Sequence, residues 1–121
     1  MAKKFRSKYE KTIKQLSDKR IKYEPIKLEY IVKKEYSPDF VLPNGILVEA
    51  KGNFRSTFER TKMLLIKEQN PEYEIRFLFQ NPNLPIQKGS KTTYAKWAEK
   101  KGFKWASGEQ IPQEWVDEKR S

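Results

Sequence analysis

The sequence contains no cysteine and no histidine, and both absences limit the chemistry open to the protein. Without cysteine there are no disulfides, zinc ribbons or thiol nucleophiles. Without histidine, zinc hydrolase sites, histidine-metal nuclease sites and the Ser-His-Asp triad are excluded. Any hydrolytic chemistry must therefore use carboxylates, lysine and a hard metal ion that prefers oxygen ligands.

Long hydrophobic runs are also missing. No stretch approaches the roughly 20 apolar residues that cross a membrane, and no basic helix shows the broad apolar face of a surface-lying anchor. The first eight residues, MAKKFRSK, lack the apolar core of a signal peptide. These features predict a cytoplasmic protein that has no membrane partner.

The charge is strongly one-sided. The 121 residues include 26 Lys and Arg against 16 Asp and Glu, which gives a formal net charge of +10. A field of this sign attracts polyanions, of which nucleic acid is the usual one. A chain of this length is predicted to form one domain over residues 1–121. Since only 36% of the residues are hydrophobic, a partner subunit is a plausible source of further stability.

Hydrophobic spacing predicts a mixed α/β order of elements. Apolar residues at helical spacing predict a first helix over residues 3–18, and alternating apolar residues predict a strand over 22–33. The later elements are predicted as a hairpin over 36–51, a helix that opens with the capping pair Ser56 and Glu59 and ends at Asn70, a strand over 73–79, a helix that carries Tyr94, Trp97 and Ala98 and ends at Gly102, a short strand over 103–106 and a helical end over 112–119.

Residues 36–51 give the clearest hairpin signal. Pro43, Asn44 and Gly45 fit a three-residue loop with a glycine bulge, which sets Asp39 opposite Glu49. A two-residue Asn-Gly turn would instead set Phe40 opposite Glu49, which the hydrophobic pattern disfavours. The period of two then predicts a core-facing set and an opposite set, which are Phe40, Leu42, Ile46, Val48 and Ala50 against Asp39, Val41, Leu47, Glu49 and Lys51.

The second of these faces carries the candidate chemistry. Two opposed carboxylates repel each other unless a cation lies between them. Asp39 and Glu49 are therefore predicted to bind Mg²⁺ or Mn²⁺, with the Ala50 carbonyl as a further ligand. Lys51 would orient or activate the attacking water, or offset charge on the phosphate. The alternative interpretation is a solvated charged face without chemistry.

Pro38-Asp39 followed by Glu49-Ala50-Lys51 resembles the catalytic signature of the restriction-endonuclease-like PD-(D/E)xK nuclease superfamily. The similarity to the endonuclease I family of T-seven-type bacteriophages goes further and runs from about residue 5 to residue 117. Besides the hairpin, it is carried by Phe5-Arg6-Ser7 with Glu10, by Leu64 to Pro71 and by Ile111 to Trp115.

The resemblance implies a restriction-endonuclease-like mixed β-sheet flanked by helices, in an intertwined, element-swapped homodimer. It also implies cleavage of four-way (Holliday) and other branched DNA junctions by paired nicks, in a phage-infected or prophage-carrying bacterial host. By spacing alone, Glu10 would be a surface carboxylate that pairs with Lys14. The resemblance makes it a catalytic residue and metal ligand that joins Asp39, Glu49 and Lys51 of the partner subunit at a site for two metals.

Branch shape would be recognised through phosphates with little reading of base edges. The candidate contacts are Arg6, Ser7, Lys8, Lys11, Arg55, Arg60, Lys62 and Lys67. Trp97, Trp105 and Trp115 could stack on bases, but their apolar neighbours favour core packing. Two alternatives stay open: a nuclease of the same superfamily that acts on mismatches, flaps or duplex, and a nonenzymatic basic DNA-binding module.

Overall fold

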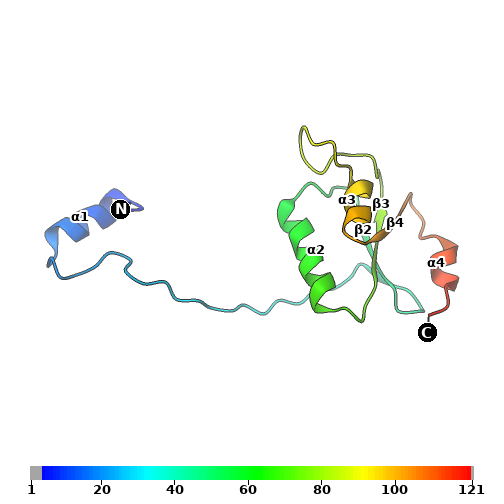
Figure 1. The fold of residues 1–121 in the computed structure, drawn as a ribbon, viewed down its shortest axis with the longest axis horizontal. Coiled ribbons are helices and arrows are strands. Elements are labelled where there is room, and N and C mark those ends of the chain that lie inside the picture. Colours follow the sequence, from blue (N-terminus) through cyan, green and yellow to red (C-terminus); the bar gives the residue numbers. More distant parts are fainter. Residues whose placement is uncertain (1–3, 121) are drawn as a thin grey trace. The chain divides into compact units, whose positions relative to one another are not determined.

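The computed structural model describes residues 4–120, which divide into two units, with the boundary between Lys34 and Glu35. The first unit contains helix α1 (Lys8–Leu16), and the second contains the sheet and the remaining helices (Figure 1). Helix α1 is shorter than the predicted span of 3–18, and residue 3 lies outside the described residues. No helix in the described part of the chain is long and apolar enough to cross a membrane.

Helix α1 begins at Lys8 because Ser7 caps it. The Ser7 hydroxyl accepts a hydrogen bond from the Glu10 backbone N–H at 3.1 Å and donates one to Glu10 Oε1 at 3.3 Å. This arrangement resembles a capping box and satisfies a backbone group that the helix itself leaves unpaired. The chain after the helix returns toward its start, where the rings of Phe5 and Tyr23 lie 4.5 Å apart between centroids.

The predicted strand over residues 22–33 is not formed in this chain, so that prediction is wrong for the structure described. The segment runs without regular secondary structure (Figure 1). Leu28, Tyr30 and Ile31 in it are more than four-fifths exposed. A strand exists only when a neighbouring strand pairs with its backbone groups. Alternation of apolar residues without such a neighbour therefore leaves an irregular, exposed segment.

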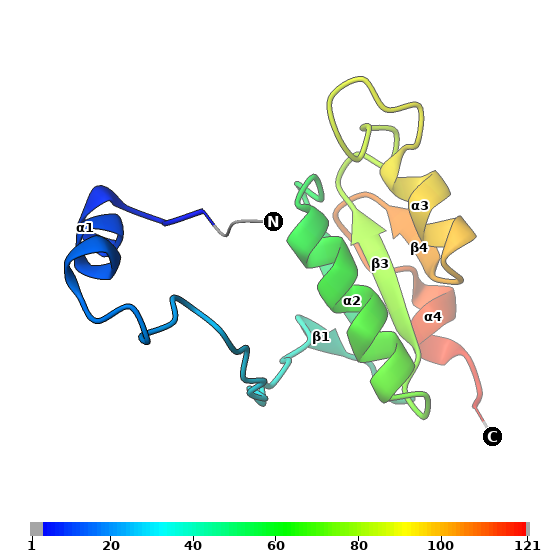
Figure 2. The same ribbon diagram turned by 60° about the vertical axis from the view of Figure 1, so that its left-hand side comes forward.

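The second unit is built on a four-stranded mixed sheet in the order β1-β2-β3-β4, formed by Phe40–Val41, Leu47–Lys51, Ile75–Phe79 and Lys104–Ser107. Strand β1 runs antiparallel to β2, while β2, β3 and β4 are parallel. Parallel neighbours need crossover connections, which are supplied by α2 (Thr57–Gln69) and α3 (Tyr94–Lys100) (Figure 2). The predicted α/β class with a mixed sheet and flanking helices is confirmed.

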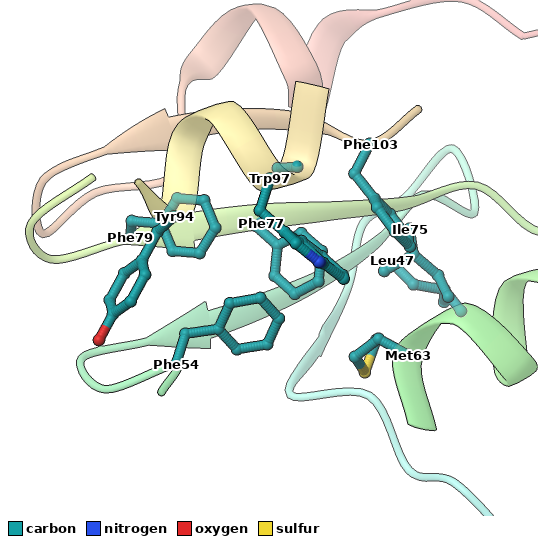
Figure 3. Close-up of a cluster of buried hydrophobic side chains, with 10 residues drawn as sticks. Leu47, Phe54, Met63, Ile75, Phe77, Phe79, Tyr94, Trp97 and Phe103 are labelled. Atoms are coloured by element: carbon teal, nitrogen blue, oxygen red, sulfur yellow. The ribbon is translucent and has the colours of Figure 1, made fainter. Parts of the chain in front are cut away.

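The main core lies between the sheet and helices α2 and α3. Phe54 is at its centre, with its ring centroid 5.1 Å from that of Phe77 and 5.0 Å from that of Trp97 (Figure 3). Trp97 is buried here, and Trp105 packs against the same cluster. Trp115 belongs to the other side of the sheet. The expectation that the tryptophans serve core packing is confirmed.

A second, smaller cluster covers the opposite face of the sheet. The buried residues there include Leu42, Ile46 and Val48. Trp115, from α4 (Gln113–Asp117), packs against them. The predicted core face is thus correct at these three hairpin positions but wrong for Phe40 and Ala50, which are exposed. Neither belongs to the buried cluster on this face, since alternation predicts which face a side chain is on but not whether another element covers it.

Helix α2 follows the predicted boundaries, and only some of its apolar residues are buried. Ser56 caps its first turn and Asn70 its last. Met63 is buried in the main core, whereas Phe58 and Leu65 are largely exposed. The buried stripe of the helix is completed by Leu64 and Ile66. The three elements after α2 lie close to their predicted spans, and Gly102, with a φ of 82°, ends the α3 segment as expected.

Arg76 anchors the C-terminal segment to the centre of the sheet. Its guanidinium is almost fully buried, donates to the carboxylates of Glu74 and Glu118, and lies 5.3 Å from the Trp115 ring centroid. Hydrogen bonding to Arg76 holds the pKa of Glu118 below its ordinary value. Burial pushes the pKa of Glu74 upward, but the bonds from Arg76 and Arg120 outweigh this and lower it.

The Arg76 pairs predict how stability depends on pH. A carboxyl group whose pKa is depressed by folding stabilises the protein above its unfolded pKa, and this contribution is lost as the pH falls through the folded value. Glu118→Gln should therefore unfold at a lower urea concentration than the wild type at pH 7, and the gap should close below the ordinary glutamate pKa of 4.5. Glu109→Gln, at an exposed carboxylate, is the matched control. A gap that stays constant between pH 7 and pH 3 would contradict the assignment.

Candidate active site

The β1–β2 hairpin places the two candidate metal ligands opposite each other. Phe40 pairs with Val48 and Val41 with Leu47, which is the predicted register. The turn is closed by a hydrogen bond from the Gly45 N–H to the Leu42 carbonyl at 2.9 Å, and Gly45 has a φ of 90°. This positive φ is a conformation that glycine adopts without strain. The predicted three-residue turn is thus confirmed.

Asp39 and Glu49 are fixed to each other through backbone groups. The Asp39 N–H donates to Glu49 Oε1 at 3.1 Å, and the Ala50 N–H donates to Asp39 Oδ2 at 2.9 Å. One oxygen of each carboxylate is therefore held by the hairpin itself. Asp39 Oδ1 accepts no hydrogen bond from residues 4–120, and Glu49 Oε2 forms an ion pair with Lys51, whose Nζ is 3.6 Å away. Both oxygens can therefore take a metal ion as a further partner.

Glu49 is the most buried of the candidate residues, with only 5% of its surface exposed. The Tyr36 hydroxyl donates to Glu49 Oε1 at 2.6 Å. Burial, followed by this hydrogen bond to a carboxylate, raises the pKa of Tyr36 far above its ordinary value. The phenol therefore remains a neutral donor over the working range of pH and holds Glu49 in its orientation.

Lys51 lies on the same face and is held by two carboxylates. Its ammonium group donates to Glu59 of α2, and its Nζ lies 3.6 Å from Glu49 Oε2. Burial opposes the charged form of Lys51, but the hydrogen bond to Glu59 and the nearby carboxylates outweigh it and raise the pKa of Lys51. The same hydrogen bond lowers the pKa of Glu59. Lys51 is thus a fixed positive charge beside the two candidate ligands.

Sequence reasoning did not identify Tyr36 and Glu59 as parts of this site. Tyr36 was visible only as the first residue of the hairpin, three positions before Asp39. Glu59 was assigned to a capping box. Its backbone N–H does bond to the Ser56 hydroxyl at 3.2 Å, but its carboxylate turns to Lys51. The sequence signal that could have revealed it is a carboxylate in the first turn of the helix that directly follows β2, the strand of Glu49 and Lys51.

The donor set fits a hard divalent cation. Asp39, Glu49 and the Ala50 carbonyl offer only oxygen atoms, which Mg²⁺ and Mn²⁺ prefer. Within residues 4–120 no group of three or more His, Cys, Asp or Glu side chains is arranged to hold a metal. A magnesium ion usually binds through one or two carboxylates and completes its shell with water and substrate phosphate. Two carboxylates and a carbonyl are therefore a sufficient protein contribution.

Glu10 lies in the first unit, on α1. Its carboxylate accepts hydrogen bonds from the Ser7 and Tyr23 hydroxyls, and hydrogen bonding to Glu10 raises the pKa of Tyr23. Its partners are therefore hydroxyl groups, and not Lys14 as the helical spacing suggested. Asp39, Glu49 and Lys51 are brought together by the second unit, and Glu10 is not among the residues of that unit.

The expected DNA contacts divide into exposed and structural residues. In the first unit Lys8 and Lys11 are exposed, Arg6 pairs with Glu24 at 3.0 Å, and Ser7 caps α1. In the second unit Arg55 and Lys62 are exposed, and Lys62 Nζ lies 5.7 Å from the centroid of the Tyr36 ring, next to the site. Lys67 donates to the Gly102 carbonyl at 2.8 Å, near the other end of α2.

Arg60 has a structural role in place of the expected DNA contact. It is 6% exposed, and its guanidinium donates to the Phe54 and Ile86 carbonyls, both at 2.9 Å, and to the Thr57 hydroxyl at 3.2 Å. A guanidinium that is buried and hydrogen-bonded in this way cannot reach a phosphate on the surface. Sequence reasoning could not separate it from Arg55, since both are arginines near the start of α2.

Comparison with known proteins shows similarity over the whole chain. The family model described as phage endonuclease I matches residues 1–121. Endonuclease I of Escherichia phage T7 is 47% identical over 120 residues. The match covers 94% of this chain and 79% of that protein. Endodeoxyribonuclease 1 of Enterobacteria phage T3 is 45% identical over 108 residues, which cover 84% of this chain and 70% of that protein.

The Tyr36 hydrogen bond predicts a change in metal affinity. Tyr36→Phe removes the donor that orients Glu49, and loss of such a supporting hydrogen bond typically weakens metal binding by about 10- to 100-fold. Isothermal titration with Mn²⁺ in the absence of DNA measures the effect directly. Tyr73→Phe deletes the same hydroxyl at a half-exposed position before β3 and should bind Mn²⁺ like the wild type. Equal affinities of the Tyr36 variant and the wild type would show that the hydroxyl does not position a ligand.

Proposed function

The chain belongs to the phage endonuclease I family, and we propose that it is a metal-dependent endodeoxyribonuclease that resolves four-way and other branched DNA junctions. The observation that carries this proposal is the cluster of Asp39, Glu49 and Lys51 on one hairpin. It lies inside the matched region and has the donor chemistry that phosphodiester hydrolysis requires. The net charge of +10 suits a polyanionic substrate.

The proposed reaction is hydrolysis by in-line attack of water on a junction phosphate, with a 5′-phosphate and a 3′-hydroxyl as products. Mg²⁺ or Mn²⁺, two per site, would supply Lewis acidity and an activated water when bound. Asp39, Glu49 and the Ala50 carbonyl would hold the metal ions, and the Tyr36 hydroxyl fixes the orientation of Glu49 by donating to its Oε1. Lys51, which Glu59 holds beside the two carboxylates, would orient or activate the attacking water or offset negative charge on the phosphate.

We propose further that Glu10 of one subunit completes the site of its partner in an intertwined homodimer. Two features support this arrangement. Glu10 belongs to a different unit from the other catalytic residues. The segment that joins the helix to the hairpin also exposes the large apolar residues Leu28, Tyr30 and Ile31, and exposed apolar surface of this kind is typical of a protein interface. A twofold dimer would present two equivalent sites, which suits paired nicks.

DNA binding is proposed to run through the phosphate backbone. The exposed basic residues on α1 and on the start of α2 would position the branch, while base edges are left unread. Arg60 is omitted from this set because it is buried. The set consists of Lys8 and Lys11 of α1 with Arg55 and Lys62 at the start of α2. Arg6 and Ser7, just before α1, and Lys67, near the other end of α2, complete the proposed contacts.

Cleavage of a labelled four-way junction, compared with a linear duplex of matched sequence, tests the function. We expect paired cuts near the branch with Mg²⁺, none with chelator, and little cutting of the duplex. Glu49→Gln should reduce the rate by at least about 1000-fold, since it removes a metal ligand, and should still bind the junction. Glu109→Gln should cut normally. Equal cutting of junction and duplex would favour another target, and tight binding without any cutting would favour a nonenzymatic module.

A mixed dimer tests whether the sites are shared between subunits. Glu10→Gln and Glu49→Gln should each be inactive alone. In a dimer of one subunit of each, a shared arrangement produces one fully intact site and one doubly altered site. Co-expressed chains with two different affinity tags should therefore nick one strand of a junction. If each site were built from a single chain, both sites of the mixed dimer would lack one residue and no nicking would be seen.

A further inference from the structure

The loop between β3 and α3, residues 80–93, is itself a small ordered hairpin. Pro85 and Thr93 form a bridge, and the Ile86 N–H donates to the Thr92 carbonyl at 2.9 Å. A turn from Gln87 to Ser90 forms its tip, so the tip comprises residues 87–91. In Figures 1 and 2 the loop extends beyond the end of the β3 arrow, past the helices.

This loop is attached to the catalytic strand and to the start of α2. The Gln80 N–H donates to the Lys51 carbonyl at 3.1 Å. Arg60 then joins the Ile86 carbonyl of the loop to the Phe54 carbonyl of the β2–α2 connection. Arg60 is adjacent in sequence to Glu59, which holds Lys51. The position of the loop is therefore set by the same short stretch of chain that sets the position of the site.

The loop and the β2–α2 connection carry basic residues without acidic partners. Residues 80–93 contain Lys88 and Lys91 and no Asp or Glu, and residues 52–58 contain Arg55 and no Asp or Glu. All three side chains are exposed, and none forms an ion pair with residues 4–120. One carboxylate, Glu109, follows β4 at this edge of the sheet. By contrast, Arg76 at the start of β3 is matched by carboxylates.

We propose that the loop tip, through Lys88 and Lys91, and Arg55 together form a surface that binds the phosphate backbone of the duplex arm entering the active site. The tip, Gln87-Lys88-Gly89-Ser90-Lys91, carries no apolar side chain, which suits phosphates and does not suit an apolar protein partner. Because the hairpin is ordered before binding, little conformational entropy is lost when DNA docks. This proposal rests on the proposed function, since it takes DNA to be the substrate.

The test is the binding of a fluorescently labelled four-way junction in chelator, so that no cleavage is required. Lys88→Ala/Lys91→Ala removes both tip charges, and Lys100→Ala/Lys101→Ala removes two exposed charges from the opposite end of α3. Each lost phosphate contact lowers the slope of log affinity against log salt by about 1. The tip variant should therefore lose about 2 from the slope and bind on the order of tenfold or more weakly at 0.1 M salt. The control pair should change little.

The outcomes separate this proposal from the proposed function. If the tip variant matches the Lys100/Lys101 control in both junction affinity and salt slope, the proposed binding surface is wrong. A reduced slope with unchanged thermal unfolding would support it. The same reduction on a linear duplex would still support a backbone contact, because phosphates are common to both substrates. If the wild-type protein binds the junction but never cuts it, the proposed function is wrong. The salt slope of the tip variant would still show whether the loop contacts DNA.

Discussion

A carboxylate buried in a strand is the constraint on which the site depends. Glu49 is nearly inaccessible to solvent, and a buried charge is costly unless it is paired and hydrogen-bonded. Tyr36, the Asp39 N–H and Lys51 supply this compensation. Lys51 then needs its own partner, which is Glu59 of α2. The requirement to stabilise one carboxylate thus links the segment before β1, strand β2 and the crossover helix α2.

The parallel arrangement of β2 and β3 also connects the candidate site to the loop that follows β3. Strands β2 and β3 are parallel, so the β2–α2 connection and the loop after β3 leave the sheet at the same edge. Arg60 joins these two segments through their carbonyl groups. The segments that follow β2 and β3 are in this way held together by the buried guanidinium of Arg60. A substrate-binding surface formed by these two segments would be held rigid by the core, as is common for functional loops on a fixed scaffold.

The sequence predicted the features that depend on local pattern. Pro43 and Gly45, together with the period of two, predicted the hairpin register and the opposition of Asp39 and Glu49. Tyr36 and Glu59 were missed because their roles arise from side-chain contacts that neither periodicity nor capping rules describe. The strand over 22–33 was wrong because strand pairing is not a local property: an alternating segment gives no indication of whether a neighbour exists. Phe40 and Ala50 were misplaced since alternation predicts a face but not whether anything covers it.

The arginines show why residue type alone could not locate a nucleic-acid surface. Arg55, Arg60 and Arg76 contribute equally to the net charge, but Arg60 is bound to backbone carbonyls and Arg76 to two carboxylates. The charge of Arg76 is neutralised by its carboxylates, whereas Arg60 keeps its charge but has its guanidinium buried and its donors used inside the fold. Arg55 is exposed and has no such partner among the described residues. In a chain this basic, a polyanion is attracted mainly to the basic side chains that remain exposed and unpaired after folding. Their positions depend on which other basic side chains the fold buries or pairs with carboxylates.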